Sequence, residues 1–227
     1  MAKILAFDTS TDACSVAVSL DGEVQEDFRV IPRQHTQQLL PMVESILANA
    51  GLAVNQLDAI AFGRGPGSFA GIRIATGAAQ GLAYAADLPL LPVSTLEAMA
   101  LAAVEQTGAE QVVAALDARM DEIYVASYRC KDGLLVPELA EMVCAPGDLE
   151  LSGQGYLAVG SGWVYLNDMS EAVRSVVTPA EEACYPAAGQ MLKLALRDWE
   201  KGLAVAADKA LPVYLRDEVA WKKKDQQ

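Results

Sequence analysis

A glycine-rich stretch at residues 63–71, which reads Gly-Arg-Gly-Pro-Gly-Ser-Phe-Ala-Gly, constrains the fold of this chain more than any other segment. Residues 57–62, just before it, form a short apolar run bounded by turn residues, which is typical of a buried strand. Residues 72–86 follow without a proline and are rich in alanine, which predicts a helix. This order brings free backbone N–H groups and the positive end of a helix to one point. Such a point suits either an anion or the backbone of a closely packed neighbouring segment.

The loop does not match three glycine motifs whose chemistry is understood. It lacks the Gly-Lys-Ser/Thr ending of a P-loop. Its glycines are followed by proline and serine at offsets that do not fit a dinucleotide-binding fingerprint. Ser68 directly follows Gly67, unlike the serine of a Gly-x-Ser-x-Gly elbow. A tight structural turn is therefore favoured over a phosphate cradle, and both remain open.

The composition indicates a globular protein with an aliphatic core and an acidic surface. Among 227 residues, 52% are hydrophobic and only 6% are aromatic, and the formal net charge is −13. A chain this acidic is not expected to bind nucleic acid unaided, because phosphates require a local basic surface. The one basic cluster, three lysines at residues 222–224, lies in a polar terminal tail and is interpreted as a solvated end.

The cysteines and the N-terminus favour a cytoplasmic protein. The four cysteines are scattered without a Cys-x-x-Cys pair, which argues against a zinc or redox motif and fits free thiols in a reducing compartment. The chain enters a strand pattern at once rather than an apolar leader, and no apolar stretch approaches transmembrane length. We therefore expect no contact with a membrane.

The first thirty residues predict a three-stranded meander. Residues 4–7, 15–20 and 23–30 have strand patterns, and Asp21-Gly22 is a strong hairpin turn. The polar turn after the first strand carries a carboxylate and three hydroxyls, at Asp8, Thr9, Ser10 and Thr11. These groups could present themselves to a phosphate and its Mg²⁺. A tight turn capped by its own side chains is an equally good interpretation.

Two helices, predicted at residues 36–50 and 72–86, carry more apolar surface than one sheet face can cover. Small residues four apart on the second helix permit close approach of another helix. We predict a partner interface formed by Leu40, Met42, Leu47, Gly77, Ala78, Gly81 and Ala85. Excess apolar area of this kind is typical of protein interfaces, and the alternative is ordinary core. His35, the only histidine, is assigned to the start of the first helix.

The rest of the chain predicts a second unit built like the first. A strand at residues 88–93 and a helix ending near residue 105 complete the first unit. Strands at 112–116 and 123–128 then form a hairpin, and a further strand, a loop and a helix near residue 163 follow it. Residues 186–200 are amphipathic and end at Gly202, which predicts a last helix. Both halves begin with hairpin-joined strands and continue with helices, which predicts an α/β protein of two related lobes. We place them at residues 1–108 and 109–227, and the last helix or tail could pack back on the first lobe.

Several segments together resemble one known family. The start Ala6-Phe7-Asp8-Thr9-Ser10-Thr11 is similar to the actin, hexokinase and chaperone ATPase (ASKHA) superfamily. The glycine loop, the hairpin around Arg119 and residues 212–216 resemble more narrowly the TsaB family, also called YeaZ. This resemblance extends from residue 1 to about residue 216. The loop residues that carry it are Gly65, Pro66, Gly67, Ser68, Arg73, Asp117, Arg119 and Glu122.

The resemblance implies a two-lobe, actin/hexokinase-like (ASKHA) fold in which each lobe is a mixed sheet with helices. It also implies a non-catalytic dimerisation subunit of the tRNA threonylcarbamoyladenosine machinery, which binds and activates the related catalytic subunit TsaD. With the ATPase TsaE, that complex transfers threonylcarbamoyl to the adenosine next to the anticodon, so tRNA is bound only through the complex. A homodimer is possible when the chain is alone.

The same resemblance implies no catalytic residue, metal site or cofactor in this chain. TsaD carries a His-x-x-x-His metal pair inside an Asn-His-Leu-Glu-Gly-His segment, and Thr95 and Met99 stand at the matching positions here. A threonine hydroxyl and a thioether are poor replacements for imidazole at a transition metal. The alternative is an ATP-binding enzyme of the superfamily that still uses nucleotide through Asp8.

Overall fold

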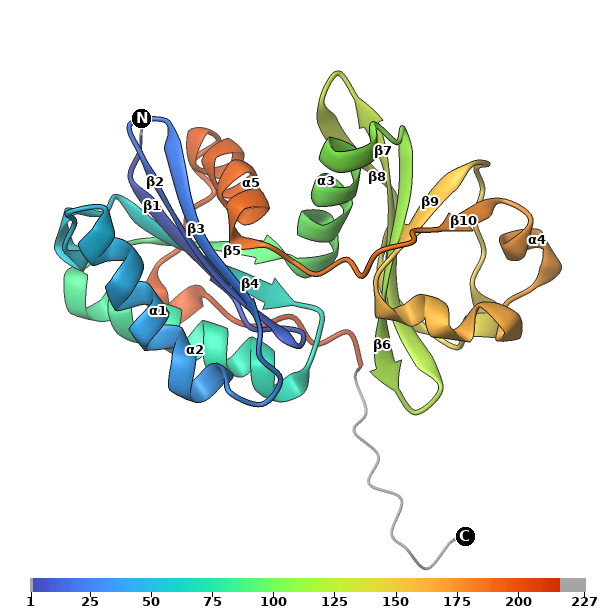
Figure 1. Cartoon of the computed structure of the whole chain (residues 1–227), viewed down its shortest axis with the longest axis horizontal. Helices are drawn as coiled ribbons and strands as arrows, with labels where there is room; N and C mark the ends of the chain where they lie inside the picture. Colours follow the sequence, from blue (N-terminus) through green and yellow to red (C-terminus); the bar gives the residue numbers. More distant parts are fainter. Residues whose placement is uncertain (1, 217–227) are drawn as a thin grey trace, which may run out of the picture.

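The computed structural model describes residues 2–216 and consists of two five-stranded sheets that lie side by side with helices around and between them (Figure 1). The lysine cluster at residues 222–224 lies outside the described residues. The strand order is β3-β2-β1-β4-β5 in the first sheet and β10-β9-β6-β7-β8 in the second. Reading the second sheet backwards gives the same topology as the first, an antiparallel meander extended by two parallel strands.

The first sheet follows the predicted meander closely. Its strands are β1 (Ile4–Asp8), β2 (Ala13–Leu20), β3 (Glu23–Val30), β4 (Ala59–Gly65) and β5 (Leu90–Ser94). The hairpin between β2 and β3 turns at Asp21 and Gly22, whose φ values are 53° and 90°. Positive φ at both central residues matches the right-handed twist of the strands that they join.

Three helices cover this sheet. Helices α1 (His35–Asn49) and α2 (Phe69–Ala86) pack on one face, and α5 (Ala188–Glu200) packs on the other. Helix α2 begins at Phe69, three residues earlier than predicted, because the Ser68 hydroxyl accepts a hydrogen bond from the Gly71 N–H and caps the helix. It ends at Asp87, which has the left-handed φ of 54°.

The second sheet consists of β6 (Gln111–Arg119), β7 (Glu122–Lys131), β8 (Leu134–Cys144), β9 (Tyr156–Val159) and β10 (Val177–Pro179). Helix α3 (Thr95–Thr107), capped by Ser94, covers one face, and the short helix α4 (Glu171–Arg174) lies beside β10. Within residues 2–216, four 3₁₀ helices occupy connections, at η1 (Val54–Gln56), η2 (Pro146–Asp148), η3 (Ser161–Asp168) and η4 (Ala207–Lys209).

Helices α3 and α5 lie between the two sheets (Figure 1) and give the lobes a shared apolar core. Ala61 of the first sheet, Met99 of α3, Met191 of α5 and Val112 of the second sheet belong to this same cluster. Helix α5 follows the second sheet in the sequence, yet it packs against β1 and β2 of the first sheet. The lobe boundary at residue 108 stays a prediction, since α3 precedes it and still contacts β6 and β7.

The exposure expected for the first helix is wrong at two of its three positions. Leu40 is 52% exposed, whereas Met42 is 1% exposed and Leu47 is 4% exposed. At about 100° per residue, positions 42 and 47 fall at the two edges of the wide arc that α1 buries against the sheet. On α2, Gly77, Gly81 and Ala85 are exposed and Ala78 is partly exposed.

These burial values separate core from surface in a direct stability test. We expect Leu47→Ala to lower the free energy of unfolding by about 3 kcal/mol, because it removes a buried side chain and leaves a cavity. Leu40→Ala, seven residues earlier on the same helix, should change it by less than about 0.5 kcal/mol. Urea denaturation of both variants measures the two values, and equal losses would contradict the assignment of Leu47 to the core.

Candidate functional site

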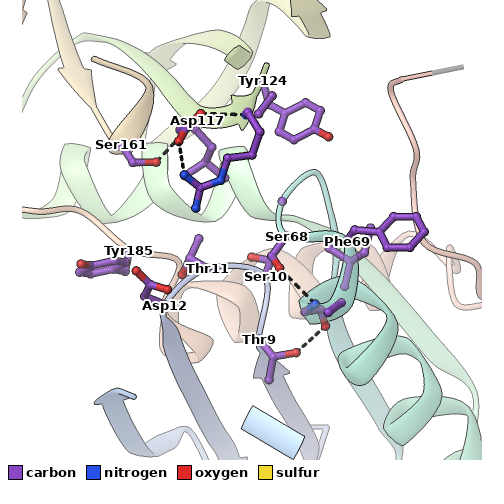
Figure 2. A pocket seen from close by; sticks show the side chains of 18 of the residues that line it. Thr9, Ser10, Thr11, Asp12, Ser68, Phe69, Asp117, Tyr124, Ser161 and Tyr185 are labelled. Carbon is purple, nitrogen blue, oxygen red and sulfur yellow. Dashed lines mark hydrogen bonds and ion pairs between the residues drawn. The ribbon is translucent and has the colours of Figure 1, made fainter. Parts of the chain in front are cut away.

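A cavity of about 1180 Å³ lies between the two lobes. One wall is formed by the β1–β2 turn with the glycine loop, and the other by the β6–β7 hairpin with the start of η3 (Figure 2). Because the two sheets share one topology, these two hairpin turns are equivalent elements of the two halves. The candidate site is therefore the place where the repeated halves face each other.

The β1–β2 turn is held by its own side chains. The Asp8 Oδ1 atom accepts hydrogen bonds from the Ser10 N–H at 2.8 Å and from the Ser10 hydroxyl at 2.7 Å. The β6–β7 hairpin repeats this arrangement, since Asp117 Oδ1 accepts from the Arg119 N–H at 2.8 Å. This geometry matches the self-capped interpretation of the polar turn, and phosphate binding by the turn stays an untested prediction.

Asp8 itself does not face the cavity. It is 1% exposed, and its Oδ2 atom lies against Gly63, in the space that a Cβ there would need, without a hydrogen-bond partner in the described structure. Burial raises the pKa of the Asp8 carboxyl from 3.8 to about 6, against the opposing effect of the hydrogen bonds from Ser10. The side chains of Thr9, Ser10 and Thr11 do line the cavity.

The glycine loop accommodates the backbone of the β1–β2 turn. The Ser68 N–H donates to the Ser10 carbonyl oxygen at 2.7 Å, and the Thr9 hydroxyl donates to the Gly71 carbonyl oxygen at 2.7 Å. A Cβ at Gly67 would clash with the Ser10 carbonyl, and one at Gly71 would clash with the Thr9 carbonyl. The sequence left two alternatives for this loop, an anion or a closely packed neighbouring backbone. The second alternative accounts for both Gly67 and Gly71.

The opposite wall carries the hairpin residues singled out in the sequence. Arg119, Met120 and Asp121 have φ values of 62°, 58° and 58°, an uncommon run of left-handed residues without a glycine. The Arg119 guanidinium pairs with Asp117 at 2.9 Å, yet the arginine side chain is 86% exposed. Figure 2 shows Asp117 beside Ser161, whose hydroxyl accepts from the Asp117 N–H at 3.1 Å.

The structure also brings together motif residues whose contact the sequence did not reveal. Arg73 of α2 contacts Tyr214, and Glu122 of the hairpin contacts Arg216, so residues near the C-terminal end of the described chain touch both walls. Phe69, whose ring lies under the Arg73 guanidinium, was not among the site residues predicted from the sequence. Its place next to the capping Ser68 at the start of α2 was the signal available.

Thr95 and Met99 lie at the N-terminal end of α3 and are buried. The Thr95 hydroxyl donates to the Ser10 hydroxyl oxygen at 3.3 Å, and the Met99 methyl group packs where a side chain at Gly160 would stand. His35 begins α1, as predicted, and its Nε2 lies 3.1 Å from the Ala13 carbonyl oxygen. Within residues 2–216, no three His, Cys, Asp or Glu side chains are grouped closely enough to hold a metal ion.

Over the part of the chain that the structure describes, no helix is both long and apolar enough to span a membrane.

Comparison with known proteins identifies similar sequences and structures. A family model described as "TsaD: tRNA N6-adenosine threonylcarbamoyltransferase" matches residues 29–224. The Escherichia coli protein named tRNA threonylcarbamoyladenosine biosynthesis protein TsaB is 46% identical, with 97% of each chain covered. The Haemophilus influenzae protein of the same name is 43% identical, over 97% of this chain and 96% of the relative.

Solved structures agree with the sequence relatives. YeaZ from Pseudomonas aeruginosa superposes with a TM-score of 0.89 at 45% identity, and the match covers 95% of this chain and all of that chain. A second Pseudomonas aeruginosa structure, described as having similarity to peptidase YEAZ, gives the same TM-score at 43% identity. The expected two-lobe, actin/hexokinase-like fold with a mixed sheet in each lobe is thus confirmed.

The buried Asp8 carboxyl predicts a specific dependence of stability on pH. Because its folded-state pKa lies above 3.8, the contribution of Asp8 to stability is fully present in acid and is lost as the pH rises through about 6. In Asp8→Asn the side chain cannot ionise, and its amide oxygen can still accept the hydrogen bond from the Ser10 N–H. Relative to the parent, this variant should therefore gain about 1 kcal/mol between pH 5 and pH 7.5.

Urea denaturation at the two pH values measures this gain. Asp12→Asn, at an exposed position of the same turn, is the matched control for the loss of one carboxylate. A stability difference for Asp8→Asn that does not change with pH would show that Asp8 is not the buried titrating group described above.

Proposed function

The chain belongs to the TsaB (YeaZ) family of tRNA threonylcarbamoyladenosine biosynthesis proteins, and we propose that it acts there as a non-catalytic subunit. In this proposal it binds a TsaD-type catalytic subunit through the exposed face of α2 and activates transfer of threonylcarbamoyl to the adenosine next to the anticodon. TsaE joins the resulting complex, and tRNA is bound only through it. The site of action is the cytoplasm.

Two exposed glycines on α2 are the observation that carries this proposal. Glycine inside a helix costs about 1 kcal/mol relative to alanine, so a packing reason is expected. At Gly77 and Gly81, however, an added Cβ would meet nothing within 4 Å. Gly67 and Gly71, by contrast, are required by the chain's own packing. A partner helix that approaches closely across α2 would supply the missing reason.

The surroundings of these glycines suit a protein interface. Tyr84, on the same helix, is 86% exposed, and Leu40 of the neighbouring α1 is 52% exposed. Gly77 and Gly81 leave a shallow strip on the helix surface, referred to below as the glycine trough. Large apolar side chains beside this trough offer contact area, and the trough itself offers room for a partner helix. Self-association in the absence of the catalytic subunit would use the same face, so the two modes of assembly would exclude each other.

The positions of Thr95 and Met99 support a non-catalytic role. At the place where the TsaD resemblance puts two metal-binding histidines, these side chains instead serve packing and a hydrogen bond to Ser10. Neither is a good ligand for a transition metal bound through nitrogen. The activating role would then depend on surface contacts rather than on chemistry within this chain.

The alternative is an ATP-using enzyme of the same superfamily. The interlobe cavity of about 1180 Å³, lined by Thr9, Ser10 and Thr11, favours it. Against it, the Asp8 carboxylate that would hold a nucleotide-bound Mg²⁺ is buried behind the turn, with Oδ1 bonded to Ser10.

An activity measurement separates the two functions. The purified chain, given ATP, Mg²⁺, threonine, bicarbonate and tRNA, should form no modified tRNA and should not hydrolyse ATP. Addition of the other enzymes of the pathway, including TsaD and TsaE, should restore tRNA modification, and omission of this chain should abolish it. Turnover by the chain alone would contradict the non-catalytic proposal and favour the enzyme.

A bulky charged side chain in the glycine trough tests the interface. We expect Gly77→Arg to fold with unchanged or slightly higher stability, since it removes a helical glycine in open space. The same variant should bind the TsaD subunit at least about a hundredfold more weakly, because a buried, unpaired arginine is costly at a close helix contact. Titration calorimetry measures the affinity, and thermal unfolding measures the stability.

Ala172→Arg provides the matched control for this experiment. Position 172 is exposed on α4 of the second lobe, so the substitution adds the same charge to a helix far from the proposed face. It should bind like the parent. If folded Gly77→Arg also binds like the parent, the interface assignment is wrong.

A further inference from the structure

The last described residues, 211–216, run from the first lobe to the second and are referred to below as the C-terminal strap. Just before the strap, the Ala210 carbonyl oxygen accepts a hydrogen bond from Gln80 of α2 at 2.9 Å. Within it, the Val213 N–H donates to the Arg64 carbonyl oxygen at 2.8 Å. In Figure 1 this red segment passes from beneath the first sheet toward the end of β6.

In the middle of the strap, Tyr214 packs on the first turn of α2. The Arg73 Nε atom donates to the Tyr214 hydroxyl at 2.8 Å. The Arg73 guanidinium carbon lies 3.3 Å from the centre of the Phe69 ring and 5.2 Å from that of Tyr214, within the range of cation–π attraction. The two rings also contact each other, with centroids 6.0 Å apart. This stack fixes the strap to the N-terminal end of α2.

At the end of the strap, Arg216 holds the β6–β7 hairpin. Its Nη2 donates to the carbonyl oxygens of Ala118 at 3.2 Å and Arg119 at 3.3 Å, and it also pairs with the Glu122 carboxylate. Its Nη1 lies 3.6 Å from the Met120 sulfur. These acceptors flank or belong to the hairpin's run of left-handed residues, a conformation that is sterically unfavourable for residues with a Cβ.

We propose that the strap couples the partner-facing end of α2 to the β6–β7 hairpin at the cavity. Phe69 and Arg73 precede Gly77 and Gly81 at intervals of four residues, so they continue the same ridge of the helix. A protein bound along that ridge would press on the Phe69–Arg73–Tyr214 stack and shift Arg216 through two intervening peptide units. The conformation of the hairpin would then depend on whether the α2 face is occupied.

The physical link is tested in the free chain by hydrogen exchange of the backbone amides at residues 118–124. Arg216→Ala should speed exchange there about fivefold, because loss of roughly 1 kcal/mol of hydrogen bonding favours local opening to that extent. Arg73→Ala, which touches only the other end of the strap, should speed it about threefold by the same reasoning. The double variant should exchange no faster than Arg216→Ala, since both changes act through one connection.

Two further variants serve as controls. Tyr84→Ala, at an exposed position near the other end of α2, should leave exchange of the hairpin unchanged. Tyr214→Phe removes only the hydroxyl that accepts from Arg73 and should give an intermediate effect in a folded protein. If Arg73→Ala and Tyr214→Phe both leave the hairpin unchanged while Arg216→Ala speeds its exchange, the strap is a passive anchor and the coupling proposal is overturned. If Arg216→Ala has no effect either, the strap does not hold the hairpin at all.

The consequence for assembly rests on the proposed function and has its own readout. Binding of the TsaD subunit should slow hairpin exchange in the parent, whereas Arg216→Ala should bind within threefold of the parent affinity without that slowing. Equal slowing in both would overturn coupling through the strap. Failure of the parent to bind would refute the proposed function but not the link measured in the free chain.

Discussion

The packing of the β1–β2 turn against the glycine loop is the contact on which the rest of the structure depends. Two backbone carbonyls of the turn, at Thr9 and Ser10, occupy the space where side chains at positions 71 and 67 would lie. Ser68 donates its N–H to the turn and uses its hydroxyl to cap α2. The start and direction of α2 are thereby fixed relative to the first sheet. The cavity at the N-terminal end of α2 and the exposed glycines farther along the same helix both follow from that placement.

Several contacts join the two lobes beside the cavity. Helices α3 and α5 share one apolar core with both sheets. Helix α5 lacks a capping side chain of its own, and the Glu26 carboxylate of β3 accepts from the Gly189 N–H at 2.9 Å instead. Across the junction, Arg64 of β4 pairs with Glu141 of β8 at 2.9 Å. Such connections limit rigid-body movement of one lobe against the other.

The sequence predicted most elements but not all of them, and the failures have local causes. The meander, α1, α2, α3 and α5 have strong periodic patterns and lie near their predicted ranges. Strand β8 was missed because its residues are mostly exposed and include Pro137, so neither alternation nor a buried run marks it. Strand β10 has only three residues. The burial of Met42 and Leu47 was misjudged because the width of a helix's buried arc depends on what packs against it.

The sequence by itself determined the α/β class, the two related halves, the polar turn and the glycine loop, because these depend on local patterns of hydrophobicity, glycine and turn residues. The family resemblance indicated which loop residues matter, but it did not reveal what they contact. Only the tertiary structure decided that the glycines of the loop receive the backbone of the turn and that Asp8 faces inward. It alone showed that residues 211–216 connect α2 to the hairpin. These outcomes depend on contacts between residues about 60 to 140 positions apart, whose geometry no local pattern encodes.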